Sequence, residues 1–353
     1  MQERIIQISQ QLIPLFNRVM DGLEWLLKQV IRVWAWFNSI DIPLSPIQWV
    51  LLFYVIFGVA FTVSTPVFEA NEEIWHFGVV QYIRQTGDLP VQQFDGTDTI
   101  YQQHGSQPPL YYGLMSLITS PFSIDDAESY RELNPHVRDN QPDSFGNKNF
   151  VLRDSSLSMF SGTGLVVLVI RVVGLVLGAI TIVAVYEIGK YIAPQRPTVA
   201  FVAAAITGLN PMFIFVSASV NNDVLAMAFN SIIVLLMLRT LRDGFNMRYS
   251  LVIAVLLALT SITKLTSLVL IPVLIGVGYF TYQKSKDRRG LIFFFSMMAI
   301  FLMLISGWWY VRNFQLYGEL FGIYTMADIA GPRGVTFGPL TLLTEYQQFR
   351  MSY

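Results

Sequence analysis

Apolar and polar positions divide this chain into long apolar stretches joined by short polar connections. A stretch of about 20 apolar residues is long enough to cross a bilayer as a helix. Seven such stretches lie at residues 47–65, 164–191, 198–217, 223–241, 249–263, 266–283 and 290–311. The fifth is the shortest, and Thr263-Lys264-Leu265-Thr266 separates it from the sixth. The pattern predicts an all-α polytopic membrane protein with about seven transmembrane helices.

Residues 1–46 have a different pattern. Between residues 3 and 37, charged and amide side chains recur mostly three or four positions apart among Ile, Leu, Val and Trp. This spacing is typical of amphipathic helices that lie in the membrane interface. Charges between Asp21 and Arg32 argue against a spanning helix. The segment could anchor the chain to the membrane surface or dock it to a partner subunit.

Composition supports the membrane class and excludes several functions. The chain is 53% hydrophobic and 13% charged, whereas soluble domains are about one quarter charged. A net charge of −1 argues against nucleic acid as a partner. The absence of cysteine excludes disulfides, a thiolate nucleophile and thiolate metal ligands.

Basic residues predict the orientation, because cytoplasmic connections of membrane proteins are enriched in Lys and Arg. Three connections carry them: Lys190 and Arg196; Arg239, Arg242 and Arg248; Lys284, Lys286, Arg288 and Arg289. The N-terminus is then cytoplasmic and the loop of residues 66–160 extracytoplasmic. The predicted domains are residues 1–46, a transmembrane domain of 47–312 that includes this loop, and an extracytoplasmic segment of 313–353.

The 66–160 loop is too long for a simple connection. Asn71 could cap a helix that runs to about Thr86, with Glu72 and Glu73 in its first turn. Pro108-Pro109 predicts the start of a second helix over about 110–120. The polar stretch 123–158 is predicted to be an irregular loop.

Glu72, Glu73 and His76 are the first candidates for chemistry. On a helix, His76 shares a face with either acid. Glu72 and Glu73 could supply a catalytic base, or Glu73 and His76 could hold a divalent cation such as Mg²⁺ or Mn²⁺. A solvated helix start is the plain alternative. His104 and His136 could add a ligand, although isolated loop histidines are usually polar surface.

Further candidates converge on the predicted outer face. Asp223 could bind a cation or orient an acceptor, although Asn and Asp, as in Asn222-Asp223, also cap helices. A cation inside a span usually has a partner or faces a cavity, and Arg171 is such a residue unless it snorkels to the surface. The predicted phosphate-binding group is Arg171, Asn222, Asp223, Lys264, Arg312 and Asn313. Gly174 and Gly178 fit helix packing better than chemistry.

These motifs resemble the GT-C membrane glycosyltransferases, which take sugars from polyprenyl-phosphate carriers and include the protein O-mannosyltransferases and aminoarabinose transferases. The similarity spans about residues 45–320. It is most specific at Asn71-Glu72-Glu73-Ile74-Trp75-His76-Phe77 and at Gln107-Pro108-Pro109-Leu110-Tyr111-Tyr112. The resemblance implies a bacterial plasma-membrane enzyme in which Glu72 occupies the place of the catalytic acid, and outer-face cations with an optional metal meet the donor phosphate.

Two other functions compete with this interpretation. One is a non-catalytic GT-C-derived scaffold or lipid-binding subunit of a larger complex, favoured by Glu72 where the family usually has Asp. The other is a secondary transporter, which would place its polar residues near the midplane of the membrane. The polar residues of this chain gather at one face instead.

Overall fold

The computed structural model describes residues 44–92, 99–135, 149–152 and 156–330, together with Trp25, Lys28, Gln29 and Arg32. Most of the predicted interfacial segment, residue His136, and the chain after residue 330 lie outside these residues. The chain divides into two compact units, Met1–Ser45 and Pro46–Tyr353. In the first unit, Trp25, Lys28, Gln29 and Arg32 are helical. The second unit carries the fold and the site.

The described part of the second unit is helical, with a single isolated β-bridge between Leu133 and Val151. The helices of its bundle are α2 (Pro46–Ser64), α6 (Gly162–Ile192), α7 (Pro197–Gly208), α8 (Pro211–Ser217), α9 (Asp223–Asp243), α10 (Met247–Ser261), η2 (Leu265–Val269), α11 (Leu270–Ser285), α12 (Arg288–Phe301), η3 (Leu302–Ser306) and α13 (Gly307–Tyr317). Between α2 and α6 lie α3 (Glu73–Thr86), η1 (Gln102–Ser106), α4 (Leu110–Thr119) and α5 (Ala127–Tyr130), and α14 (Ile323–Ala330) follows α13.

All seven predicted apolar stretches are helical, and the chain is an integral membrane protein. Within the described residues, five helical stretches are long and apolar enough to span a membrane: Pro46–Ser64, Gly162–Ile192, Asp223–Asp243, Leu265–Ser285 and Arg288–Tyr317. The pair α7 and α8, bent by 61°, makes a sixth if it is one broken span. Helix α10, with 15 residues, is shorter than a usual span.

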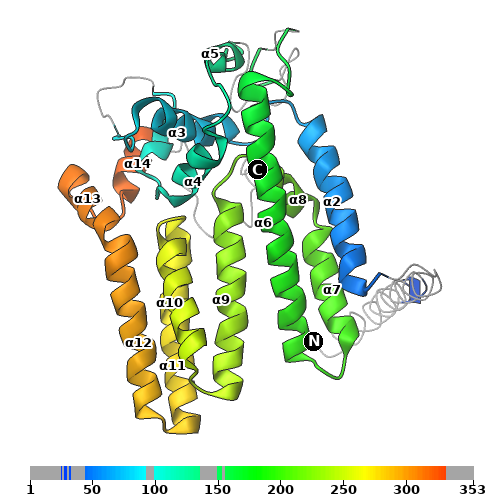
Figure 1. The fold of residues 1–353 in the computed structure, drawn as a ribbon, viewed down its shortest axis with the longest axis vertical. Helices are drawn as coiled ribbons and strands as arrows, with labels where there is room; N and C mark the ends of the chain where they lie inside the picture. Colours follow the sequence, from blue (N-terminus) through cyan, green and yellow to red (C-terminus); the bar gives the residue numbers. More distant parts are fainter. Residues whose placement is uncertain are drawn as a thin grey trace, which may run out of the picture. The chain divides into compact units, whose positions relative to one another are not determined.

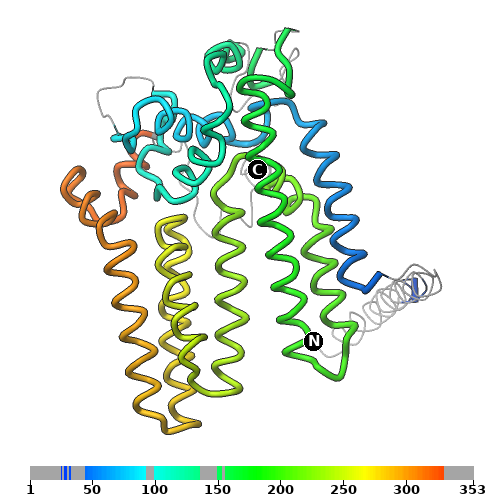
Figure 2. The backbone as a smooth tube through the Cα atoms, viewed as in Figure 1, coloured from blue at the N-terminus to red at the C-terminus, as the bar shows by residue number. Residues whose placement is uncertain are grey.

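The bend between α7 and α8 has a local cause. Asn210 caps α8, because its side-chain oxygen accepts hydrogen bonds from the backbone N–H groups of Met212 and Phe213. Pro211 follows at the first helical position, where its missing N–H costs nothing. The backbone path in Figure 2 shows this break beside the uninterrupted α6.

The spans pack in two groups that meet where α6 contacts α9 (Figure 1). One group contains α2, α6, α7 and α8, and the other contains α9, α10, α11 and α12. Gly174 and Gly178 permit close packing in the first group. A Cβ atom on Gly174 would lie 2.4 Å from the carbonyl oxygen of Ser217, and one on Gly178 would lie 2.0 Å from the hydroxyl of Tyr54. The packing role expected for these glycines is confirmed.

Helices α3, α4 and α5 gather at one end of the bundle (Figure 1). Their apolar core includes Phe68, Phe77 and Tyr111 and continues into α6 and α9. Of the two predicted ends of α3, the C-terminal one is correct and the N-terminal one is not. Gly87, at φ 75°, ends the helix after Thr86 as expected, but the first residue is Glu73, and no side chain caps it. The expected Asn71 cap with both acids inside the helix is therefore wrong.

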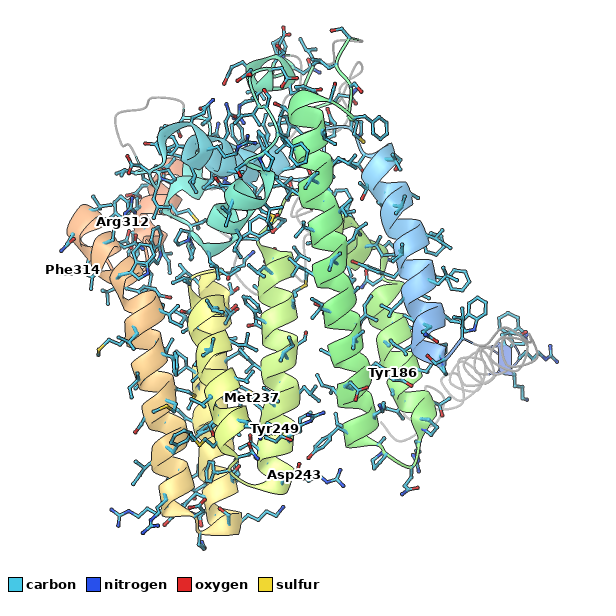
Figure 3. All side chains as sticks on the ribbon, in the orientation of Figure 1. Tyr186, Met237, Asp243, Tyr249, Arg312 and Phe314 are labelled. Atoms are coloured by element: carbon cyan, nitrogen blue, oxygen red, sulfur yellow. The ribbon has the colours of Figure 1, made fainter. Side chains whose placement is uncertain are left out.

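The opposite end of the bundle combines cations with aromatic rings. The guanidinium of Arg242 lies 5.0 Å from the ring centre of Tyr191, and that of Arg239 lies 5.9 Å from Tyr249. Figure 3 shows Tyr186, Tyr249 and Asp243 toward this end and Arg312 toward the end that carries α3. Aromatic rings are enriched at both interfaces of a membrane with water, and Lys and Arg in the cytoplasmic connections.

Candidate active site

The most buried charged groups of the site are Glu73 and Arg171, both fully shielded from solvent. They form a bidentate ion pair: Arg171 Nε donates to Glu73 Oε1 at 2.9 Å, and Nη2 donates to Oε2 at 2.6 Å. The other guanidinium hydrogens donate to the backbone carbonyls of Thr62, Thr65 and Pro66. An arginine has five N–H donors, and all five are used.

The carboxylate of Glu73 is equally occupied. Besides Arg171, it accepts hydrogen bonds from the backbone N–H groups of Phe68 at 3.0 Å and Val220 at 2.9 Å. One carboxylate thus connects the turn after α2, the start of α3, helix α6 and the turn before α9. Neither Glu73 nor Arg171 has a free polar position for a ligand in this arrangement.

Glu72 lies immediately before α3 and, unlike the buried Glu73, is exposed to solvent. Its backbone adopts the left-handed conformation, with φ 56°, which is uncommon for a residue other than glycine and is often found at functional sites. Its side chain is 48% exposed. The neighbouring His104, and more weakly Lys264, lower the pKa of this carboxyl. Glu72 is therefore an ionised, accessible carboxylate.

His76 lies one turn into α3, and a chain of hydrogen bonds connects it to α9. Its Nδ1 is 2.8 Å from the hydroxyl of Tyr112, which donates to Gln107 Oε1 at 2.9 Å; the same amide oxygen accepts from Asn222 Nδ2 at 2.9 Å. Because Tyr112 donates its only proton to Gln107, its oxygen must accept from His76, so Nδ1 carries the hydrogen. Burial lowers the pKa of His76 well below its usual value. The imidazole is neutral, with its lone pair on Nε2.

His104, in η1, completes a group with Glu72 and His76. Its ring is 1% exposed, and neither of its nitrogens has a hydrogen-bond partner. The ring stands edge-on to His76 with centroids 4.4 Å apart, and Nε2 is 3.7 Å from Glu72 Oε2. One ligand atom from each of the three residues lies within 4.8 Å of the others. The sequence paired His76 with Glu73 as metal ligands, whereas the structure brings His76 together with Glu72 and His104.

Asp223 and Lys264 form a second charged pair at the same end of the bundle. Lys264 Nζ contacts Asp223 Oδ1, and both side chains are about one-third exposed, at 31% and 37%. The backbone carbonyl of Thr263 accepts from the side chain of Asn222 at 3.0 Å, which fixes the loop of Lys264 against the start of α9. The Asn221 side chain accepts from the N–H of Asp223. The predicted convergence of Asn222, Asp223 and Lys264 is a feature of the structure.

Arg312 and Asn313 lie on a neighbouring part of this end. Arg312 Nη2 donates to the carbonyl of Pro90 at 3.0 Å, and its guanidinium lies 5.1 Å from the ring centre of Trp309. Its Nη1 is buried without a partner, as is the Oδ1 of Asn313. Helix α14, which follows, packs against η1. No direct contact joins Arg312 to Glu72 or Lys264 among the described residues.

Three site residues had no specific role in the sequence analysis. Gln107 and Tyr112 belong to a motif that the sequence displays, but only the fold shows that they connect His76 to Asn222. His104 was one of two loop histidines of equal standing. Only the fold identifies His104 as a site residue. His104 lies 28 residues from His76 in the sequence, and the packing of η1 on α3 brings the two rings together.

The fold and this site define an integral membrane protein with a cluster of carboxylates, imidazoles and a lysine at one end of its helical bundle. Residues 157–310 match the family described as dolichyl-phosphate-mannose-protein mannosyltransferase. This segment, less than half of the chain, is similar to the PMT_2 family, a GT-C family of membrane glycosyltransferases that use lipid-linked sugar donors. The matched segment contains Arg171, Asp223 and Lys264. No curated protein matches the chain.

Proposed function

We propose that this protein transfers a sugar from a polyprenyl-phosphate carrier to an acceptor hydroxyl on the extracytoplasmic face of the membrane. The observation that carries the proposal is the accessible pair of carboxylates, Glu72 and Asp223, which both interact electrostatically with Lys264 at the end of the spans. A lipid carrier places its phosphate at this depth. The basic, aromatic opposite end supports a cytoplasmic location for that end and an outer location for the site.

In the proposed reaction, Glu72 takes the proton of the acceptor hydroxyl. The hydroxyl oxygen attacks the anomeric carbon, and the bond from that carbon to the phosphate oxygen breaks, with its electron pair leaving on the phosphate. A single displacement inverts the anomeric configuration. Lys264 is the cation best placed to stabilise the departing phosphate, where preorganised charge is most effective. The unpartnered Nη1 of Arg312 is a second candidate donor.

Arg171 and Glu73 have a different role in this proposal. Because all five donors of Arg171 and both oxygens of Glu73 are bonded within the protein, we assign them to positioning. They hold Glu72 and the turn before Asp223 in place.

The test compares three variants in membranes that contain polyprenyl-phosphate mannose. Glu72→Gln should abolish consumption of the donor, and Asp223→Asn should reduce it. Asp88→Asn changes an exposed acid of the same loop and is the control. Retained turnover in Glu72→Gln with loss in Asp223→Asn would transfer the base role to Asp223. Retained turnover in both would refute the assignment of the site.

A non-catalytic lipid-binding subunit is the second candidate. The lowered pKa of Glu72 favours it, because a carboxylate with a low pKa is a weak base. This candidate predicts that the purified chain binds polyprenyl phosphate, with an affinity that depends on Lys264, and that no variant changes the fate of a donor.

A further inference from the structure

We infer that Glu72, His76 and His104 bind one divalent transition-metal ion, of the class to which Zn²⁺ belongs. The binding site stands on its own geometry. The function that we give to the ion, which is to hold an oxygen of the donor phosphate, rests on the proposed transferase activity. In that activity Glu72 would bind the ion through one carboxylate oxygen, and its other oxygen would take the proton of the acceptor hydroxyl.

The three side chains form a ligand set from separate elements: the residue before α3, the first turn of α3, and η1. Their ligand atoms lie within 4.8 Å of one another, and Glu72 Oε2 is 3.7 Å from His104 Nε2. Ligand atoms about 2.0–2.2 Å from a tetrahedral zinc ion are about 3.4 Å apart. Small rotations of the exposed Glu72 side chain and the two rings therefore suffice to close the site.

Two imidazoles and one carboxylate select the kind of metal. Imidazole nitrogen is a good ligand for zinc and neighbouring transition metals, whereas Mg²⁺ prefers oxygen ligands and retains several waters. The Mg²⁺ and Mn²⁺ options of the sequence analysis become less suitable, and Zn²⁺ fits better. Three protein ligands also leave one position of a four-coordinate ion open for a substrate, as in catalytic zinc sites.

His104 provides evidence that is independent of this spacing. Buried polar side chains almost always have hydrogen-bond partners, and an exception calls for an explanation such as an ion. The ring of His104 is 1% exposed, yet both of its nitrogens lack partners, and it faces His76 and Glu72. A metal bound to Nε2 accounts for the burial of this nitrogen.

His76 is already arranged as a ligand. Metal-binding histidines usually donate their second N–H to a neighbouring oxygen, which fixes the ring and its tautomer. Here Nδ1–H donates to the hydroxyl of Tyr112, and Tyr112 is held in turn by Gln107. The lone pair for the metal is on Nε2.

The charge of the site supplies a reason for the ion. Glu72 and Asp223 contribute two negative charges and Lys264 one positive charge, so these three groups have a net charge of −1. Arg171 is saturated by protein groups. A site of this charge repels a phosphate, and a divalent cation changes the same sum to +1.

The test measures metal on the full-length chain, purified in detergent without a polyhistidine tag, stripped with a chelator and dialysed against ZnCl₂. We expect about one zinc per chain in the wild type, as for a single catalytic zinc site. Glu72→Gln and His104→Gln should weaken zinc binding by at least about tenfold, since loss of a supporting residue alone costs about 10–100-fold. Tyr112→Phe, which removes the hydroxyl that connects His76 Nδ1 to Gln107, should fall within that 10–100-fold range.

His136→Gln is the matched control, because it removes the third histidine of the chain. Equal loss of zinc in His136→Gln and His104→Gln would show adventitious binding and overturn the inference, as would a wild-type chain that binds no zinc. Metal-free His104→Gln should melt close to the metal-free wild type, since the native ring has no hydrogen bonds to lose. If His104→Gln does not fold, the zinc affinity of Tyr112→Phe tests the inference in its place. Zinc binding is measured without donor or acceptor. A chain that binds zinc but consumes no donor would refute the proposed function and leave the metal site intact.

Discussion

The adjacent acids Glu72 and Glu73 should respond oppositely to the same substitution, because their surroundings differ. Glu73→Gln removes a carboxylate that is fully buried and bonded twice to Arg171. Removal of one partner of a buried ion pair leaves an uncompensated charge and costs about 3–5 kcal/mol of unfolding free energy. The N–H groups of Phe68 and Val220 also lose a charged acceptor. Glu73→Gln should therefore be strongly destabilising.

Glu72→Gln removes a carboxylate that is 48% exposed and 3.7 Å from its nearest charged partner. Exposed ion pairs contribute about 0–1 kcal/mol. The glutamine keeps the shape of the side chain, so this variant should unfold like the wild type while it loses donor turnover.

The assay is thermal unfolding in detergent, followed by tryptophan fluorescence, beside donor consumption in membranes. We expect a decrease of at least about 5 °C in the melting temperature for Glu73→Gln, from about 2–4 °C per kcal/mol in a domain of this order of size. The double variant Glu73→Gln/Arg171→Met should recover part of that decrease, because it also removes the unpaired cation. Equal melting temperatures for the two single variants would refute the separation of a positioning acid from an accessible one.

Three further predictions follow from the local geometry. Glu72→Gly should leave the melting temperature unchanged or raise it, because glycine adopts φ 56° without the steric cost of about 1–2 kcal/mol that other residues incur. The same variant should abolish turnover of the donor. A large decrease in its melting temperature would contradict the strain argument. Gly174→Ala should destabilise the protein by about 1–3 kcal/mol, since its Cβ would lie 2.4 Å from a backbone oxygen, whereas Gly276→Ala, with no atom within 4 Å, should be neutral or stabilising. Lys264→Met should change stability little, because the side chain is 31% exposed, but should weaken binding of polyprenyl phosphate by about tenfold or more, as expected for loss of one charged hydrogen bond.

Local patterns were sufficient to predict most of the helices. The length of each apolar stretch predicted α2, α6 and α9, and Pro108-Pro109 predicted the start of α4 at Leu110. These signals depend on neighbours in the sequence. Helix length and proline position can be read from the local sequence, so predicting these helices does not require knowledge of the packing.

The arrangement of the site depends on contacts between distant residues, which a single sequence does not display. Glu73 pairs with a residue 98 positions away, and Tyr112 connects to His76 across 36 positions. Consequently, the sequence predicted Glu72 and Glu73 as catalytic candidates and Arg171 as a phosphate-binding candidate within a span, but could not assign the buried and accessible roles. The start of α3 was misplaced for the same reason, since the side chain of Glu73 bonds to Arg171 and Val220 and leaves Glu72 outside the helix.

The buried pair also explains how two accessible carboxylates from different parts of the chain are held in one site. Glu73 is covalently next to Glu72, and its Oε1 accepts the N–H of Val220, three residues before Asp223. The same oxygen accepts a hydrogen bond from Arg171 on α6, so Glu72 and Asp223 are both positioned relative to α6. Catalysis of a displacement needs its polar groups fixed to within fractions of an ångström before the substrate arrives. A shift of Glu73 would therefore move Glu72 and Asp223 together, and substitutions at Glu73 and Arg171 should change the affinity and turnover of donor without contact with it.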